Sequence, residues 1–315
     1  MRARRTFGAG AALLALLTAA ACGTNDDTNA ERGSQPQGAA LRITLGTQEF
    51  PEARILGELW RQALAVNGYT VDLRKSVGPA EDLDALLRDS EIDGHVAYTG
   101  TVLSVVAGED VTGLDPDQTY DKAKAFYDGR GMVMSAMTPF ENKDAIATTA
   151  AFAQSEGLES IADLGGLASF TLGARPEFED LYLGLQGLED RYGLTNAEFS
   201  PVTLGEQYAA LDDGEADAVD AFTTDPQLLS GDYRLLDDPE LLFGSQNVVM
   251  VVGEDELDRV GKQTFLRVVD AVNSRLTQGV MVDLNAAVTK GQDEEAVAQA
   301  FLRDAGLLEP LDADD

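Results

Sequence analysis

Two stretches of this sequence occur twice, in the same order and at almost the same distance. Residues 85–99 (ALLRDSEIDGHVAYT) align without a gap on residues 209–223 (AALDDGEADAVDAFT), and seven of the fifteen positions are identical. Residues 44–50 (TLGTQEF) align on residues 171–178 (TLGARPEF) with one inserted residue. The separations are 124 residues in the first case and 127 or 128 in the second, which indicates two units built on one plan. The sequence therefore predicts two lobes.

Short apolar runs alternate along the chain with stretches whose apolar residues recur at helical spacing. This alternation indicates an α/β architecture. Strands are expected at residues 41–46, 69–74, 92–97, 132–137, 144–149, 168–173, 216–222 and 246–252. Helices are expected at residues 52–66, 79–88, 177–192 and 205–213, and along a C-terminal run from Leu257 to Leu276. Because 44% of the 315 residues are hydrophobic, the chain has enough apolar surface to bury a core.

Both repeats place polar or aromatic residues directly after predicted strands. Gln48 follows the first strand of lobe one, and Arg175 follows its counterpart in lobe two. Tyr98 and Phe222 end the equivalent later strands. In open α/β sheets, ligands bind beyond the carboxyl ends of the strands. If the lobes face each other, these side chains line a cleft, which predicts a site that closes on a small molecule.

The first 22 residues have the pattern of an export signal. Three Arg residues lie within the first five positions, and the apolar stretch Gly8 to Leu17 that follows is too short to span a bilayer. Small residues then lead to Cys22, which is the only Cys of the chain. This arrangement resembles a bacterial lipobox, so residues 1–21 are expected to be a signal peptide and Cys22 the site of lipid attachment. An ordinary secretory signal stays open, as does the export route, because Arg4-Arg5 resembles part of a twin-arginine signal.

Residues 22–40 are expected to form a flexible, lipid-anchored tether. From Gly23 to Ala40 no apolar residue is larger than Ala, so this segment has nothing to contribute to a core. A lipid on Cys22 would anchor the chain to the membrane without crossing it. The predicted location is the outer face of the cytoplasmic membrane.

The chain is strongly acidic, with 23 Lys and Arg residues against 55 Asp and Glu residues and a formal charge of −32. Loss of a signal peptide with three Arg residues would bring this charge to −35. Such a charge repels phosphate backbones, which excludes a general nucleic-acid binder. Solubility explains the acidity, and a role in attracting a ligand stays open.

The common signatures of enzymes are absent from the sequence. It contains no G-x-S-x-G, no H-E-x-x-H, no P-loop and no G-x-G-x-x-G motif. His95 is the only His, so a catalytic triad or a His-based metal site would depend on it alone. The acidic cluster at residues 212–217 lacks calcium-loop spacing and is expected to be a solvated turn. We therefore expect no enzymatic activity, no catalytic residues, no metal and no cofactor.

Several segments of the chain carry a family resemblance. They are residues 43–50 with Ile55-Leu56-Gly57, Ile92-Asp93, the YTGT of residues 98–101, the PEF of residues 176–178, Gly187-Leu188, residues 192–194, Asp217, the DAFTTD of residues 220–225, and Phe243. Together they resemble the substrate-binding proteins of osmoprotectant ABC importers, in consistent order over about residues 42–305. That family binds glycine betaine, choline, carnitine and related quaternary ammonium compounds.

This resemblance implies the two-lobed type II periplasmic-binding-protein fold, in which each lobe is a sheet flanked by helices. It implies that residues 41–138 plus 243–315 form lobe one and residues 139–242 lobe two, with crossovers near residues 137–140 and 241–246. It further implies a monomeric, exported lipoprotein that delivers its ligand to ABC permease subunits with a cytoplasmic ATPase. The alternative is a sensory module that docks on a membrane receptor without transport.

The family holds the trimethylammonium head in a cage of Tyr rings. Tyr98 and Thr101 match the family's YTGT motif, and Phe222 keeps the ring of a usual Tyr without its hydroxyl. The other departures are His95 and Ala97, which replace an aromatic and an acidic residue, and Ala145 and Gln246, which replace two further cage Tyr residues.

The family also holds the carboxylate of betaine with Lys and Arg. Gln48 stands at the Lys position and Leu181 at the Arg position, and only Arg175 is placed to compensate. A carboxylate without a cationic partner is penalised in a partly buried cleft, so choline is favoured over betaine. A larger uncharged molecule, held by Gln48, Gln246, Asn247 and aromatic stacking, stays open as the ligand. The predicted ligand-binding residues are Gln48, His95, Tyr98, Thr101, Arg175, Phe222 and Gln246.

Overall fold

The computed structural model describes residues 41–311. The predicted signal peptide, the lipid site at Cys22 and the tether to residue 40 lie outside the described residues. Among residues 41–311, no helix is both long enough and apolar enough to cross a membrane.

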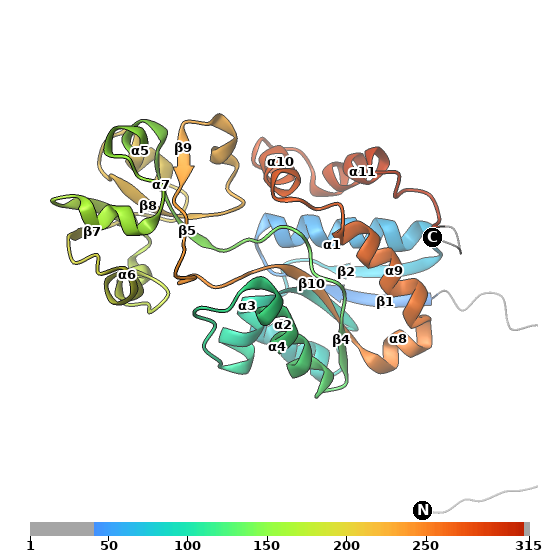
Figure 1. Ribbon diagram of the computed structural model, residues 1–315. Coiled ribbons are helices and arrows are strands. Elements are labelled where there is room, and N and C mark those ends of the chain that lie inside the picture. Colours follow the sequence, from blue (N-terminus) through green and yellow to red (C-terminus); the bar gives the residue numbers. More distant parts are fainter. Residues whose placement is uncertain (1–40, 312–315) are drawn as a thin grey trace, which may run out of the picture. The chain divides into compact units, whose positions relative to one another are not determined.

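The first sheet has five strands in the order β2-β1-β3-β10-β4 (Figure 1). They are β1 (Leu41–Gly46), β2 (Tyr69–Arg74), β3 (Gly94–Tyr98), β4 (Met132–Met134) and β10 (Val248–Gly253). Strands β2, β1 and β3 are parallel, whereas β10 runs antiparallel to both of its neighbours. We call this sheet with its helices lobe one. It therefore takes strands from both ends of the described chain.

The second sheet repeats this topology with the order β7-β6-β8-β5-β9. Its strands are β5 (Asp144–Thr149), β6 (Phe170–Ala174), β7 (Ala197–Pro201), β8 (Ala218–Phe222) and β9 (Tyr233–Leu235). Strands β7, β6 and β8 are parallel, and β5 is antiparallel to both of its neighbours, as β10 is in the first sheet. We call this sheet with its helices lobe two.

The sequence repeat has a physical basis in one carboxylate per lobe. Asp93 precedes β3, and its Oδ2 accepts a bond of 2.6 Å from the backbone nitrogen of Thr44 in β1. Asp217 precedes β8 and accepts the equivalent bond of 2.8 Å from Thr171 in β6. In both lobes the backbone nitrogen of the Asp returns a bond to the carbonyl of the same Thr. The shared motif therefore fixes the third strand of each parallel trio against the first.

The helices pack on both faces of the two sheets. They are α1 (Pro51–Val66), α2 (Ala80–Arg88), α3 (Thr99–Thr101), α4 (Pro116–Asp128), α5 (Ala150–Glu156), α6 (Leu185–Tyr192), α7 (Gln207–Asp212), α8 (Glu254–Val260), α9 (Lys262–Asn273), α10 (Gln278–Thr289) and α11 (Glu294–Asp304). Short 3₁₀ segments cover Ile161–Gly166, Pro176–Glu179 and Pro226–Ser230, and a π-helix covers Val102–Ala107.

Strand β10 is apolar at five successive positions because helices cover both of its faces. Val248, Met250 and Val252 belong to a core with α1, α9 and α11, and Val249 and Val251 belong to a core with α2 and α4. A strand buried on both faces needs a continuous apolar run rather than an alternating one. Lobe two has the same two-sided arrangement, with α6 on one face of its sheet and α7 on the other.

All eight predicted strands, and the helices at residues 52–66, 79–88 and 205–213, are present within a few residues of their expected bounds, whereas β7 and β9 were not predicted. The single helix expected at residues 177–192 is wrong, because a 3₁₀ turn and α6 replace it. The break lies at Gly184, whose backbone is not helical (φ −144°, ψ −138°), and a Cβ there would lie 2.3 Å from the carbonyl oxygen of Phe178. The C-terminal run is also divided, into α8 and α9.

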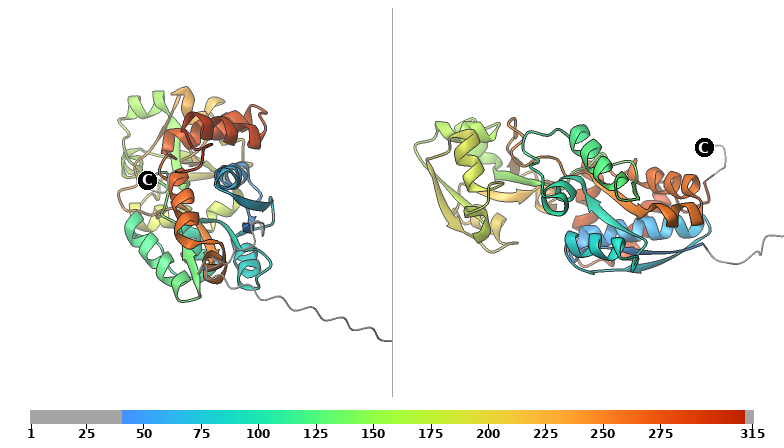
Figure 2. Two further views of the ribbon diagram at one scale, coloured as in Figure 1. Left: turned by 90° about the vertical axis from the view of Figure 1, so that its right-hand side faces the viewer. Right: turned by 90° about the horizontal axis from the view of Figure 1, so that it is seen from below.

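Two connecting segments, residues 135–143 and 236–247, join the sheets (Figures 1 and 2). They pair through an antiparallel bridge between Glu141 and Asn247, and the backbone nitrogen of Asn142 donates to the carbonyl of Gln246 at 3.2 Å. Helix α10 belongs to lobe one and packs against the 3₁₀ segment of residues 226–230 in lobe two. Both connections meet beside the carboxyl ends of β3 and β8.

Candidate functional site

A pocket of about 530 Å³ opens between the two lobes. Its lining comes from the loops that precede α1 and α2, from the ends of β3 and β8, and from the two connecting segments. The structure thus brings together five of the residues that the sequence predicts for the site. These are Gln48, Tyr98, Thr101, Phe222 and Gln246.

Aromatic rings from both lobes line the pocket. Tyr98 ends β3 in lobe one, and Phe222 ends β8 in lobe two. Phe50, at the start of α1, is a third ring, with its centroid 5.7 Å from that of Tyr98 and the planes tilted by 46°. The sequence prediction missed Phe50, although it lies in the repeated TLGTQEF segment. The three rings together give the pocket apolar walls with electron-rich faces.

A buried carboxylate holds Tyr98 in place. The Tyr98 hydroxyl donates to Glu52 Oε1 at 2.9 Å, and Glu52 is only 3% exposed. Burial raises the pKa of Glu52 above its usual value, and burial together with the neighbouring Glu52 raises the pKa of Tyr98 well above its own. Tyr98 is therefore a neutral phenol with a fixed ring orientation.

Glu52 also joins the two lobes. Its Oε1 accepts from Asn142 Nδ2 in a connecting segment at 2.9 Å, and its Oε2 accepts from Asn285 Nδ2 of α10 at 2.8 Å. The Asn285 amide donates in addition to the carbonyl of Thr224 in lobe two at 3.1 Å. The sequence prediction missed this carboxylate, which links the pocket-lining ring of Tyr98 to both sides of the cleft.

Amide groups supply the polar part of the lining. Gln48 Nε2 donates to the carbonyl of Val96 at 3.2 Å, so the amide is oriented and its buried Oε1 has no protein partner. Gln246 Oε1 accepts from the Thr101 backbone at 3.0 Å and from the Thr101 hydroxyl at 3.3 Å. Gly100 allows this contact, because a Cβ there would lie 2.5 Å from the carbonyl of Ser245.

Arg175 lies behind the pocket wall and does not belong to the lining. Its Nη1 donates to Asp144 Oδ1 at 2.8 Å and also to Asp220 Oδ2. The guanidinium carbon lies 5.8 Å from the centroid of Phe222. Asp220 is fully buried, and its pKa is raised by burial and by the charge of Asp144. The one Arg that sequence reasoning placed near a ligand carboxylate already holds two protein carboxylates.

Acidic residues outnumber basic ones in the lining. Glu49, Glu81 and Asp144 line the pocket together with a single cation, Lys143. Lys143 has a carboxylate of its own, because its Nζ lies 3.8 Å from an oxygen of Glu141. Sequence reasoning missed Lys143 and treated the acidity only as a property of the whole chain.

His95 lies inside lobe one rather than in the pocket lining. Its side chain is 2% exposed, and its Nδ1 lies 2.9 Å from the carbonyl of Val96. Burial lowers its pKa below the usual value, which favours a neutral ring. The repeat aligns His95 with Val219, a core residue of lobe two. Of the other family positions, Ala145 is buried and Leu181 is 42% exposed.

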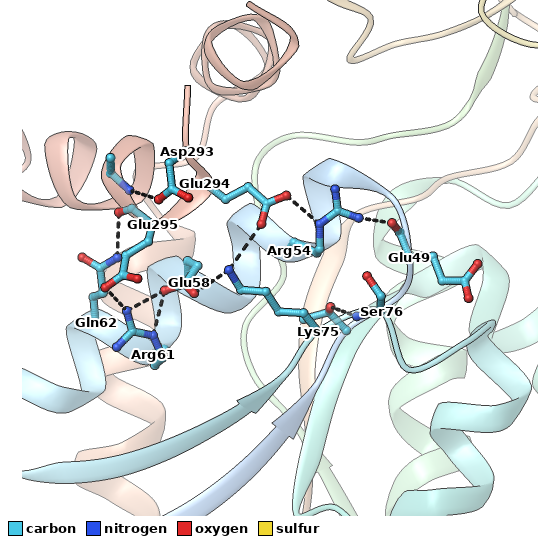
Figure 3. A network of polar contacts seen from close by, with 12 residues as sticks. Glu49, Arg54, Glu58, Arg61, Gln62, Lys75, Ser76, Asp293, Glu294 and Glu295 are labelled. Atoms are coloured by element: carbon cyan, nitrogen blue, oxygen red, sulfur yellow. Dashed lines mark hydrogen bonds and ion pairs between the residues drawn. The ribbon is translucent and has the colours of Figure 1, made fainter. Parts of the chain in front are cut away.

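An ion-pair network supports the loop that carries Gln48, Glu49 and Phe50 (Figure 3). Arg54 of α1 pairs with Glu294 of α11 at 2.6 Å, and Lys75 pairs with Glu294 at 3.3 Å. Arg54 also donates to the backbone carbonyl of Glu49, whose side chain points away from this network. The network therefore ties the pocket loop to the C-terminal helix and leaves the Glu49 carboxylate available to the pocket.

Comparison with known families identifies the chain. The model of the OpuAC family, described as the substrate binding domain of an ABC-type glycine betaine transport system, matches residues 42–304. The chain belongs to this family. OpuAC proteins are extracytoplasmic solute-binding proteins of ABC transport systems and not enzymes, so the chain is a solute-binding protein. Within the described residues no group of three or more His, Cys, Asp or Glu side chains forms a metal site.

Curated relatives of this OpuAC protein include a glycine-betaine-binding protein of Pseudomonas aeruginosa. It is 29% identical over 290 residues, which cover 87% of this chain and 90% of the relative. An ergothioneine transport permease/ergothioneine binding protein, EgtU of Helicobacter pylori, is 22% identical over 272 residues. These cover 84% of this chain but 48% of that relative, so the chain spans about half of its length.

Solved structures confirm the predicted fold class of this OpuAC protein. A glycine betaine/carnitine/choline ABC transporter structure matches with a TM-score of 0.78 and 20% identity, over 85% of this chain and 100% of the other. Apo YehZ from Escherichia coli matches with a TM-score of 0.71 and 23% identity, over 84% of this chain and 99% of the other. The chain has the type II periplasmic-binding-protein fold that these structures share.

Proposed function

We propose that this OpuAC protein binds a quaternary ammonium cation, with choline favoured over glycine betaine, and delivers it to a membrane permease. The observation that carries the proposal is the pocket lining, in which Tyr98 and Phe222 face a cleft with three carboxylates and one cation. Aromatic faces attract a trimethylammonium head without hydrogen bonds, by about 0.5–2 kcal/mol for each ring. The excess of carboxylates adds a negative potential that favours a net positive ligand.

The preference for choline follows from the state of the basic residues. Glycine betaine carries a carboxylate, which needs a cationic partner in a partly buried site. Arg175 is held by Asp144 and Asp220, and Lys143 lies beside Glu141. Choline instead carries a hydroxyl, for which the unpartnered Oε1 of Gln48 is a suitable acceptor.

Export and anchoring complete the proposal. The segment before residue 41 is a signal peptide and tether, with a lipid on Cys22, and the monomeric receptor works at the outer face of the cytoplasmic membrane. Its partners are ABC permease subunits with a cytoplasmic ATPase. Metabolic labelling with a radioactive fatty acid tests the anchor, since a Cys22→Ser variant should lose all label. Uptake of labelled choline should stop in cells that lack the gene.

Calorimetric titration of residues 23–315 tests the ligand. Choline is expected to bind, with glycine betaine at least about tenfold weaker. Ergothioneine, which is itself a betaine, serves as a third titrant because of the Helicobacter pylori relative. Tyr98→Ala should lose choline binding, whereas the matched control Tyr182→Ala should retain it, because Tyr182 is 45% exposed and lies outside the pocket lining. Absence of measurable choline binding to the wild-type protein would overturn the proposal.

A further inference from the structure

Three side chains from three separate segments form one ion cluster behind the pocket wall. Asp144 begins β5, Arg175 directly follows β6, and Asp220 lies in β8. Arg175 Nη1 donates to both carboxylates, at 2.8 Å to Asp144 Oδ1. The side chains are 25%, 19% and 0% exposed, so only Asp144 and the edge of the guanidinium reach solvent. The cluster thus presents Asp144 to the pocket and keeps Arg175 behind it.

Comparison with lobe one shows that this cluster is not a requirement of the fold. The repeat aligns Asp220 with Val96. It also aligns Arg175 with Gln48, since both stand two residues after the Gly that ends a TLG segment. In lobe one, Gln48 donates to the backbone carbonyl of Val96, and the sheet needs no charge at either position. The buried carboxylate and the guanidinium of lobe two therefore serve the site rather than the sheet.

We propose that Asp144 is a specificity-determining residue, which occupies Arg175 with a protein carboxylate and so excludes ligands that carry a carboxylate of their own. This inference rests on the proposed function of the pocket. Asp144 belongs to the lining, whereas Arg175 does not. A ligand carboxylate seeking Arg175 must occupy the position that the Asp144 carboxylate already fills.

The geometry makes Arg175 reachable by a bound betaine once Asp144 is shortened. The guanidinium carbon lies 5.8 Å from the centroid of Phe222, which is one wall of the pocket. A ligand carboxylate in the position of the Asp144 carboxylate would meet the Nη1 donor that Asp144 uses now. Asp220 would still accept a hydrogen bond from Arg175 in the variant, as it does now, and loss of the Asp144 charge would favour its ionised form. The ligand would then replace one carboxylate of the cluster by another.

The test is calorimetric titration of wild type, Asp144→Ala and Asp144→Asn with choline and with glycine betaine. Asp144→Ala should raise betaine affinity at least about tenfold and lower choline affinity several-fold, which reverses the preference. Asp144→Asn removes the charge but keeps the side-chain volume, so it should shift both affinities in the same directions with a smaller gain for betaine. Asp144→Asn also tests the inference if the cavity left by Asp144→Ala impairs folding.

Glu81→Ala is the matched control, because it removes one negative charge from the same lining in lobe one. It should weaken choline binding slightly without giving tight betaine binding. The double variant Asp144→Ala, Arg175→Gln should lose the betaine affinity that Asp144→Ala gains. Equal effects of Glu81→Ala and Asp144→Ala would show that net charge alone sets the preference, and would overturn the inference.

The two proposals fail in different ways. Wild type that binds choline while Asp144→Ala gains no betaine affinity overturns the role of Asp144 and leaves the proposed function intact. Wild type that is silent with choline overturns the proposed function. In that case a betaine gain in Asp144→Ala that requires Arg175 still supports the inference, and silence of every variant rejects both.

Discussion

The two lobes use the same backbone arrangement to present opposite chemistry to one pocket. In lobe one, Gln48 lies against the carbonyl of Val96, and this neutral contact leaves an amide oxygen for the ligand. In lobe two, Arg175 occupies the equivalent position and donates to the carboxyl group of Asp220, so this donor is already used within the protein. Equivalent positions in a repeated fold thus define where a side chain lies and leave open what it does.

The buried carboxylates of the two lobes differ in the same way. Glu52 is surrounded by neutral donors, namely the hydroxyl of Tyr98 and the amides of Asn142 and Asn285. Asp220 is balanced by the guanidinium of Arg175. Burial raises the pKa of both groups. In lobe one, hydrogen bonds of Glu52 therefore hold the aromatic ring of Tyr98 in place. In lobe two, the ion cluster holds the carboxylate of Asp144 in the pocket lining.

The largest difference is expected between Arg175→Met and Gln48→Met. Arg175→Met removes two charge-assisted hydrogen bonds, to Asp144 and to a buried Asp220 that then stays protonated, and should reduce the free energy of unfolding by about 3 kcal/mol. Gln48→Met removes one hydrogen bond to a carbonyl and should reduce it by about 1 kcal/mol. Urea unfolding of both variants measures the difference. Equal losses would show that the charged and neutral pairs are equivalent for stability.

The next effect concerns the aromatic walls. Tyr98→Ala and Phe222→Ala should each weaken choline binding by about ten- to thirtyfold, because each removes one aromatic face of the proposed cation site. Tyr98→Phe keeps the ring but loses the bond to Glu52, so it should weaken binding by less than about tenfold. Calorimetry on the three variants checks this order. If Tyr98→Phe bound choline as weakly as Tyr98→Ala, the loss of affinity would come from the hydrogen bond to Glu52 rather than from the aromatic ring.

The stability contributed by Glu52 should depend on pH in a defined direction. A carboxyl whose pKa is raised in the folded state stabilises the fold most below its ordinary value of 4.5, and this stability is lost as pH rises through the folded pKa. Wild type should therefore exceed Glu52→Gln in stability most at about pH 4, and the gap should narrow by about pH 8. Urea midpoints of both proteins at the two pH values measure the gap. A gap that widens with pH would contradict the raised pKa.

The smallest effect is expected for choline affinity through Asp220. Burial raises the pKa of Asp220 to about 8, and the groups around it are Asp144, Arg175 and Tyr208. A bound cation disfavours the proton on Asp220, so binding releases protons and affinity should rise about threefold as pH approaches and passes 8. Titration in two buffers of different ionisation enthalpy counts the protons. Asp220→Asn, which mimics the protonated acid, should bind without this pH dependence.

The sequence predicted the scaffold better than the site. The strands follow from apolar runs and from the repeat, whose shared Asp93 and Asp217 have the same backbone partners. Tyr98 and Phe222 line the pocket because strand ends meet at one edge of a sheet, and their part in ligand binding stays a prediction. His95 was misleading, because β3 is buried at all five positions, so a polar residue in its middle lies in the core rather than in the pocket lining.

The remaining site residues depend on contacts between distant segments. Glu52 follows Pro51 in the first turn of α1, where an acidic residue is ordinarily solvent-exposed. Its burial depends on groups from distant segments, among them Asn142 and Asn285. The pairing of Arg175 joins β5, β6 and β8, and no local spacing in the sequence encodes it. Such contacts between distant segments of the chain explain why the positions of the two aromatic rings were predictable from the sequence, whereas the charge pattern of the pocket was not.

The bonds of Asp93 and Asp217 to the first strand of each lobe have an evolutionary consequence. They secure each sheet at the end of its strands that is remote from the pocket, because both Asp residues precede their strands whereas Tyr98 and Phe222 end them. Substitutions at the pocket end therefore leave the fastening intact. Proteins of this fold can therefore change their ligand specificity by substituting a few pocket-lining residues, one lobe at a time, while the framework of the two similar lobes persists.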